Sequence, residues 1–413
     1  MSKIFAVVGG QFGDEGKGLM VDYLSHQLQC GIVVRHNGGS QAGHSIQLLD
    51  GTRHIFSHFG SGTFNNFPTL LASKFVVNPL LFRKEHKELL DKGYTPKVYV
   101  HSDCYITTPY DMIINQILET NRGDSRHGSC GIGFGETIER NENYPLLSSI
   151  VSDLRTDTIK QTIDLIRGSY FQIRIIEHYP DILADKQDEL LDQYSYMSSE
   201  LLEDFLQSCE YFLNNVTIIS DYDILKDSNI IFEGAQGLLL DQNYGKFPYV
   251  TRSNTGLDNV VDILNDIDNT ELLTVVHVSR SYTTRHGAGP LDYEEEFPEV
   301  LKLADKTNVH NTFQGSLRYA PLNLDNLIDA CRQDLTNAES MALFPMDSKL
   351  AITWLDIIPL PYKIIFDGKE YEFLEHDKVI QIFEDTVAYR SFGPTRETIK
   401  ERNISTTVDL KMN

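Results

Sequence analysis

Residues 9–18 read Gly-Gly-Gln-Phe-Gly-Asp-Glu-Gly-Lys-Gly and directly follow an apolar run at residues 4–8. A second apolar stretch, with helical spacing, continues over residues 19–24. A buried strand, a glycine-dense turn and a helix in this order predict a phosphate-binding loop. Glycines let backbone N–H groups approach phosphate oxygens, and the helix directs its positive end at them. Lys17 adds a positive charge to this loop.

The loop departs from the usual Walker pattern at two places. Gly10 to Gly16 encloses one residue more than the usual spacing, and Gly18 stands where a Ser or Thr would bind Mg²⁺. Asp14 is the candidate replacement, because a carboxylate among phosphate-binding amides is unfavourable unless it binds a cation or accepts a proton. The alternative is that Asp14 and Glu15 form an acidic first turn that complements the helix dipole. The surrounding glycines and Lys17 favour the first interpretation.

The composition limits the partners of the chain. Its 413 residues include 36 Lys and Arg against 59 Asp and Glu, a formal charge of −23. This balance argues against nucleic acid and anionic membranes as partners. The five cysteines are widely spaced without a Cys-x-x-Cys motif, so neither disulfides nor a zinc site are indicated. We expect a cytoplasmic protein, because the sequence shows neither a leader pattern nor an apolar run of membrane-spanning length.

The pattern of apolar runs predicts an α/β fold with a P-loop-type, mainly parallel central sheet flanked by helices. Predicted strands cover residues 4–8, 31–35, 97–101, 229–232, 272–278 and 350–354, and predicted helices cover 109–120, 157–176 and 185–214. No linker or repeat divides the chain, so we expect one domain over residues 1–413 with helical insertions at about 109–214. The loops after residues 8, 35, 232 and 278 should meet at the carboxyl ends of the strands.

The loop at residues 9–18 closely resembles the Gly-Gln-Trp-Gly-Asp-Glu-Gly-Lys-Gly signature of the adenylosuccinate synthetase family. Further matches follow in chain order over essentially the whole chain, at residues 36–44, 232–237, 239–241, 248–251, 253–255, 284–285, 287–290, 355–356 and 393–394. The family joins L-aspartate to the 6-position of a purine nucleoside monophosphate through a 6-phosphoryl intermediate. The resemblance implies a carbon–nitrogen ligase that uses Mg²⁺ and a nucleoside triphosphate, GTP or ATP, and that forms a homodimer.

The resemblance also implies roles for individual residues. The catalytic residues would be Asp14, His44 and Gln236. Asp14 would be the base that removes the purine N1 proton, His44 the acid on the phosphoryl side, and Gln236 an amide that reaches the purine or its 6-substituent. In isolation, His44 would more often be a surface histidine and Gln236 a turn residue. Mg²⁺ would be bound by Asp14 and Gly43. Donor-binding residues would be Gly13, Glu15, Gly16, Lys17, Gly18, Asp356, Ser391, Gly393 and Pro394; substrate-binding residues would be Gln41, Gly128, Ser129, Thr251, Arg285, Thr312 and Arg318.

Three segments depart from the family pattern. Residues 127–133 keep the glycine spacing but lose two threonines, and residues 312–318 keep one arginine, Arg318, where the family has several. One of the missing arginines approaches the ribose 2′-hydroxyl in the family, and Ser316 stands there now. Trp354 replaces the lysine that covers guanine, and the C-terminal base-binding part, about 350–413, is shortened.

These departures resemble the phage-type branch of the family, N6-succino-2-amino-2′-deoxyadenylate synthase, which acts on dGMP and can use an ATP-type donor. That branch tends to lose the loop aspartate, whereas Asp14 is retained here. The substrate is therefore IMP or dGMP, and the donor stays open. Two rival hypotheses are a non-catalytic purine-nucleotide sensor on the same fold and a P-loop ligase of dethiobiotin synthetase type.

In the family an arginine of the second subunit reaches the nucleotide phosphate, and Arg140 is a loose match for it.

Overall fold

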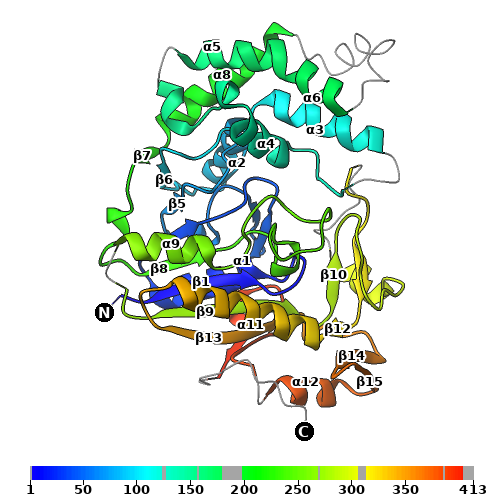
Figure 1. Cartoon of the computed structure of the whole chain (residues 1–413). Helices are drawn as coiled ribbons and strands as arrows, with labels where there is room; N and C mark the ends of the chain where they lie inside the picture. The colour runs from blue at the N-terminus through cyan, green and yellow to red at the C-terminus, as the bar shows by residue number, and fades with distance from the viewer. Residues whose placement is uncertain are drawn as a thin grey trace.

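The computed structural model describes residues 2–122, 127–155, 158–178, 198–267, 270–305, 313–384 and 387–402. Its centre is a ten-stranded sheet in which each neighbouring pair is parallel except the edge pair β16–β17 (Figure 1). The sheet order is β17 (Ile399–Glu401), β16 (Tyr389–Ser391), β13 (Met346–Thr353), β9 (Leu273–Arg280), β1 (Ile4–Gly9), β8 (Ile230–Glu233), β2 (Ile32–Arg35), β5 (Thr69–Leu71), β6 (Val98–His101) and β7 (Thr217–Ile219). The prediction of a mainly parallel α/β sheet is confirmed.

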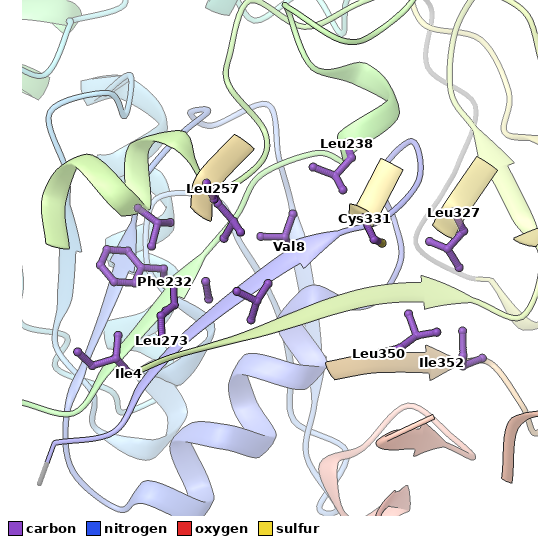
Figure 2. Close-up of a cluster of buried hydrophobic side chains, with 14 of the residues drawn as sticks. Ile4, Val8, Phe232, Leu238, Leu257, Leu273, Leu327, Cys331, Leu350 and Ile352 are labelled. Carbon is purple, nitrogen blue, oxygen red and sulfur yellow. The ribbon is translucent and has the colours of Figure 1, made fainter. Parts of the chain in front are cut away.

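Both faces of the sheet are covered, which explains why the strands are continuously apolar. Val7 of β1 packs with Leu19 of helix α1 (Lys17–Leu28) on one face. Val8 packs on the other face with Leu327 and Cys331 of α11 (Leu324–Met341), as Figure 2 shows. Helix α9 (Asp258–Ile267) lies on this second face as well. Successive residues of β1 are thus buried against different helices, and the strand is fixed in place.

A helical block stands over the β5–β7 end of the sheet (Figure 1). It contains α2 (Pro79–Asp91), α3 (Pro109–Arg122), α4 (Phe134–Asn143), α5 (Thr158–Leu165), α6 (Phe171–His178) and α8 (Ser199–Asn214). The helix predicted over residues 157–176 is interrupted by a π-helical turn, Ile166–Tyr170, which includes Gly168, a residue of low helix propensity. The helix predicted from residue 185 is described from Ser199, where the Ser198 side chain caps the amide of Leu201; residues 179–197 lie outside the described residues.

Smaller elements surround the carboxyl ends of the central strands. They are the hairpin β3 (His44–Gln47) and β4 (Arg53–Phe56), the pair β10 (Thr283–Arg285) and β11 (Arg318–Ala320), the small sheet β12 (Leu322–Asn323), β14 (Tyr362–Phe366) and β15 (Lys369–Phe373), and helices α10 (Glu299–Ala304) and α12 (His376–Glu384). Short 3₁₀ turns lie at Ser61–Asn65, Pro145–Leu147, Val151–Arg155, Asp223–Leu225, Leu238–Leu240 and Arg396–Thr398. Within the described ranges, every helix is too short or too polar to cross a bilayer.

Candidate active site

A cavity of about 940 Å³ opens at the carboxyl ends of β1, β2, β8, β9 and β13. The loops that follow these strands are far apart in sequence, yet their side chains line this one cavity. Of the residues named from the sequence, the lining includes Gly13, Asp14, Glu15, Gly16, Lys17, Gly18, Gln41, Gly43, His44, Gly128, Ser129, Gln236, Thr251, Arg285, Asp356, Ser391, Gly393 and Pro394. Thr312 lies outside the described residues, and Arg318 does not belong to the lining.

Glu15 holds the glycine loop in shape from within. Its Oε1 accepts hydrogen bonds from the backbone amides of Gln11 at 3.1 Å and Gly13 at 2.7 Å, and its Oε2 lies 2.6 Å from the Lys17 Nζ. The side chains of Glu15 and Lys17 are 0% and 3% exposed. Helix α1 begins only at Lys17, after Gly16 in the left-handed region, so its first turn carries no acidic residue. The acidic-first-turn alternative is therefore wrong; Glu15 organises the loop and pairs with its lysine.

Asp14 sits at the turn of the loop in an unusual backbone conformation. Its φ of 61° lies in the left-handed region, which non-glycine residues seldom adopt, and its carbonyl accepts a hydrogen bond from Arg280 Nε. Its Oδ2 lies 3.3 Å from His286 Nε2, with 29% of the side chain exposed. Burial raises the pKa of Asp14, but the hydrogen bond and charge of His286, with Arg280 and Lys17, outweigh it and lower the pKa to about 2. The carboxylate is ionised at neutral pH.

His286 contacts Asp14, yet its sequence context singles it out only weakly. It follows Arg285 at the end of β10 and lines the cavity. Its position between two matched motif segments was the only available signal.

His44 of β3 is oriented by a buried carboxylate. His44 Nδ1 lies 2.5 Å from Glu233 Oε1, and Glu233 also accepts hydrogen bonds from the Ser61 amide, at 2.9 Å, and hydroxyl. Burial lowers the pKa of His44 although Glu233 opposes this. Since Glu233 accepts at Nδ1, Nε2 is the nitrogen left to face a ligand. Glu233 was missed as a site residue; its signal was its place at the end of a buried strand.

The hairpin that carries His44 is anchored behind the cavity by Glu85 of α2. The backbone amides of Ser57 and His58, which follow β4, each donate to Glu85 at 2.8 Å. Burial raises the pKa of Glu85, but hydrogen bonds from His54 and His58 and the charge of His58 outweigh it, so the pKa falls to about 2. The charged form of Glu85 is the form that the fold stabilises.

Two amide side chains meet on the cavity wall without protein partners. Gln236 Oε1 and both amide atoms of Gln41 are buried and make no hydrogen bond to the residues that the structure describes. Gln236 Oε1 and Gln41 Nε2 each lie 3.6 Å from the position that a Cβ on Gly38 would occupy. Buried polar atoms are normally satisfied, so a ligand or water is expected here. Paired amides offer both donors and acceptors, as a purine edge requires.

The far wall contains Ser129, Thr251 and Arg285. Ser129 Oγ donates to Asn115 Oδ1 at 2.8 Å and accepts from the Gly131 amide at 3.3 Å. Arg285 is 2% exposed and donates to the carbonyls of Pro290 and Tyr249 at 2.8 and 3.0 Å. Burial, with repulsion from Arg318, lowers the pKa of Arg285 to about 10, which still leaves it charged at neutral pH. This buried cation is suited to a carboxylate or phosphate.

Two arginines lie elsewhere than the sequence suggested. Arg318 pairs with Glu294, Nε to Oε1 at 2.9 Å, and donates to the carbonyls of Gly287 and Gly289 at 3.1 and 2.7 Å, which holds it outside the cavity lining. Arg140 is fully buried and pairs with Asp111 at 2.8 and 2.9 Å. A guanidinium packed in the core of its own chain cannot reach the nucleotide of a second subunit, so the match to Arg140 is wrong.

Another part of the cavity lining consists of Trp354, Asp356, Ser391, Gly393 and Pro394. Trp354 has a φ of 62°, and the Arg280 guanidinium lies 4.7 Å from its ring centroid. The same guanidinium pairs with Asp305 at 3.2 Å. Arg280 therefore links this part of the cavity lining to the Asp14 carbonyl.

The oxygens near the glycine loop suit Mg²⁺. Asp14 supplies a carboxylate, and the exposed Gly43 supplies a backbone carbonyl in the same cavity. Across the described ranges, no cluster of three or more His, Cys, Asp or Glu side chains could bind a metal ion. Proteins commonly bind Mg²⁺ through one or two carboxylates together with substrate phosphates. The Asp14 carboxylate and the Gly43 carbonyl suit a site of this kind.

Comparison with known proteins places the chain. The sequence profile of the family described as adenylosuccinate synthetase matches residues 6–374. The adenylosuccinate synthetase of Borrelia turicatae is 27% identical over 415 aligned positions, which cover 98% of this chain and 90% of the relative. That of Limosilactobacillus reuteri is 31% identical over 372 positions, covering 89% and 81%.

Two solved structures share the fold. The fully ligated adenylosuccinate synthetase of Plasmodium falciparum has a TM-score of 0.72 at 19% identity and covers 97% of this chain and 100% of that one. The succinoaminodeoxyadenylate synthetase of a cyanophage, S-2L, bound to dGMP and to dATP as energy donor, has a TM-score of 0.62 at 14% identity, covering 99% and 97%. The dethiobiotin synthetase-type alternative is excluded by the family match. The chain belongs to the adenylosuccinate synthetase family and is a carbon–nitrogen ligase.

Proposed function

We propose that the enzyme joins L-aspartate to C6 of a 6-oxopurine nucleoside monophosphate through a 6-phosphoryl intermediate, with conversion of a nucleoside triphosphate to the diphosphate and phosphate. The observation that carries this proposal is the convergence in one cavity of an ionised carboxylate, Asp14, a loop lysine, Lys17, a carboxylate-bound imidazole, His44, and two unpartnered amides. A nucleotide sensor would need the phosphate loop but not the other groups.

In the first step the purine 6-oxygen attacks the γ-phosphorus, the bond from that phosphorus to the β-phosphate oxygen breaks, and the diphosphate leaves. The N1 proton passes to the ionised Asp14. The lowered pKa makes this carboxylate a weak base, so the transfer becomes favourable as phosphorylation acidifies the ring. His44 presents Nε2 to the transferring phosphoryl group. The charges of Glu233 at Nδ1 and of the phosphates favour uptake of a solvent proton by the ring, and the resulting Nε2–H donates a hydrogen bond to the group in transfer.

In the second step the amine of aspartate attacks C6, the carbon–oxygen bond to the phosphate breaks, and phosphate leaves. The amine loses one proton as the new carbon–nitrogen bond forms, and the departing phosphate or solvent takes up this proton. Gln41 and Gln236 hold the purine edge, and Arg285 provides the buried cation for a carboxylate. Asp14 and the Gly43 carbonyl would hold Mg²⁺, which neutralises phosphate charge when bound.

We infer further that 2′-deoxynucleotides, dGMP among them, are accepted at least as well as ribonucleotides. Segment 313–318 contributes Gln314 to the lining, Ser316 stands where the family carries an arginine near the 2′-hydroxyl, and Arg318 is held by Glu294. A site without a partner for a substrate hydroxyl has little means to favour it. Trp354 in place of the guanine-covering lysine supports an ATP-type donor beside GTP.

The test is a product assay with purified enzyme. Aspartate is supplied with IMP, dIMP, GMP or dGMP, each with ATP or GTP and Mg²⁺, and the succino-nucleotide is identified by mass spectrometry while phosphate release is followed. We expect kcat/KM for dIMP or dGMP to equal or exceed that of the matching ribonucleotide. A strong preference for IMP over dIMP, with no product from dGMP, would refute the deoxynucleotide assignment. Sedimentation of the same protein tests the proposed homodimer.

A further inference from the structure

Arg252 stands at the rim of the cavity, directly after Thr251. The backbone on both sides of it is hydrogen-bonded, because the Thr251 amide donates to the Leu240 carbonyl at 2.8 Å and the Ser253 carbonyl accepts from the Gln242 amide at 3.2 Å. The Arg252 side chain lines the cavity and is 38% exposed. We therefore expect the Arg252 guanidinium to move by side-chain rotation and not by movement of the loop.

The guanidinium is now held by two glutamates of α4. Arg252 pairs with Glu139 and, at 3.2 Å, with Glu142, and Glu139 also lies 3.6 Å from Arg174. Helix α4 contributes Phe134, Gly135 and Glu136 to the cavity lining, whereas Glu139 and Glu142 lie further along the helix. Partly exposed ion pairs contribute little to stability, so exchange of these carboxylates for a ligand anion is inexpensive.

The stem of Arg252 lies over the start of α4. Its Cδ is 4.0 Å from the position that a Cβ on Gly135 would occupy. The N-cap of α4 is Gly133, with a φ of 81°, and this residue provides no side-chain cap for the first amides of the helix. Helix N-termini attract anions. The start of α4, Arg252 and the predicted phosphate ligands Ser129 and Thr251 all border the same cavity.

We propose that Arg252 binds the 5′-phosphate of the purine monophosphate from within the same chain, and that Glu139 and Glu142 hold it aside until the phosphate arrives. A phosphate monoester carries nearly two negative charges at neutral pH and presents three acceptor oxygens, so it competes effectively with single carboxylates for the guanidinium fork. This inference rests on the proposed function in one respect: the ligand at this end is a nucleoside monophosphate.

The experiment measures binding without turnover. Dissociation constants of dGMP and IMP are determined by calorimetry in the absence of donor and aspartate, alongside deoxyguanosine and inosine, which lack the phosphate. Arg252→Ala is expected to weaken binding of the monophosphates about 10- to 100-fold, the usual effect of losing hydrogen bonds to a charged group, and to leave nucleoside binding unchanged. Arg252→Lys, which keeps the charge but loses the fork, should fall in between.

The matched control is Glu142→Gln, which weakens the restraint on Arg252 without removing the arginine. It should tighten monophosphate binding by up to about 5-fold, the value of an exposed pair. If the ion pairs of Arg252 only held the structure together, Arg252→Ala and Glu142→Gln would both bind the monophosphates more weakly. Unchanged monophosphate affinity in Arg252→Ala, or an equal loss for the nucleosides, would overturn the proposal. Arg252-dependent binding by an enzyme that forms no succino-product would instead refute the proposed function alone.

Discussion

Two cation–carboxylate pairs whose cations line the cavity differ in burial. Lys17 and Glu15, at the glycine loop, are 3% and 0% exposed, whereas Arg252 and Glu142, at the opposite rim, are 38% and 50% exposed. The buried pair is joined to the backbone amides of its own loop, while the exposed pair bridges a loop and a helix more than 100 residues apart. The first pair therefore preforms a site, and the second leaves its cation available for exchange.

The difference in burial between the two pairs corresponds to two tasks proposed for the enzyme, phosphoryl transfer and binding of the substrate phosphate. Phosphoryl transfer depends on groups that are placed before the substrates arrive, because reorganisation during reaction raises the barrier. Capture of a substrate phosphate needs only a cation that becomes available on binding. The predictions below test this division, in order of decreasing effect.

The strongest test concerns the chemistry at the preformed end. Asp14→Asn removes a proton acceptor and a charge with little change of shape, so kcat should fall by about 10²–10⁴-fold, as for other positioned acid–base groups, while nucleotide binding stays within a few-fold. Single-turnover kinetics and calorimetry on the same preparation measure the two quantities. Near-normal turnover would mean that another group is the base.

Breaking the buried pair should cost stability as well as activity. Glu15→Gln leaves the Lys17 charge buried without a counter-charge, which typically destabilises a protein by about 3–5 kcal/mol. Urea unfolding measures this, with Glu142→Gln as the matched rim variant, for which a change below about 1 kcal/mol is expected. Similar losses in the two variants would remove the distinction between the ends of the cavity.

Substitution of Glu85 tests whether a buried carboxylate outside the cavity stabilises the fold through its charge, as is expected of Glu15. Its pKa is lowered from 4.5 to about 2 in the folded protein, so its contribution to folding is present above pH 4.5 and is lost as the pH falls toward 2. The shift corresponds to about 3 kcal/mol. Glu85→Gln should therefore be less stable than the parent at pH 7, by up to this amount, and the difference should shrink between pH 5 and pH 2. A difference independent of pH would show that the charge of Glu85 is not stabilised by the fold.

The smallest effect is expected at Arg318. Because it pairs with the exposed Glu294 and braces the 287–289 carbonyls, Arg318→Leu should change the KM values for aspartate and both nucleotides by only a few-fold, in line with an exposed ion pair. Steady-state kinetics with each substrate varied in turn provides the measurement. A rise of 30-fold or more, about 2 kcal/mol, confined to aspartate would restore Arg318 to the aspartate site.

The strands and the glycine loop were readable from the sequence because their signals are local. The predicted strands at residues 4–8 and 229–232 contain the continuous apolar runs 4–8 and 230–232, and β1 and β8 differ from the predicted strands by only one residue at their ends. The helix expected over 157–176 was interrupted at the turn containing Gly168, since apolar spacing does not show where a helix changes its hydrogen-bond pattern.

The missed site residues depend on contacts between distant parts of the chain. Glu233 and His44 are 189 positions apart, and Arg252 and Glu139 are 113 apart. No sequence period connects such pairs. Arg318 shows the converse: its place near a motif suggested a ligand contact, but a nearby glutamate, Glu294, binds it instead.

The left-handed conformation of Asp14 has an evolutionary consequence. Glycine and asparagine adopt this conformation more readily than most residues do. Substitution of the carboxylate by either one would thus leave the loop geometry almost intact, although the chemistry would suffer. A lineage that acquired another proton acceptor would therefore be able to discard this aspartate by a single replacement, without rebuilding the loop around it. The geometry of the loop therefore does not by itself require an aspartate at position 14.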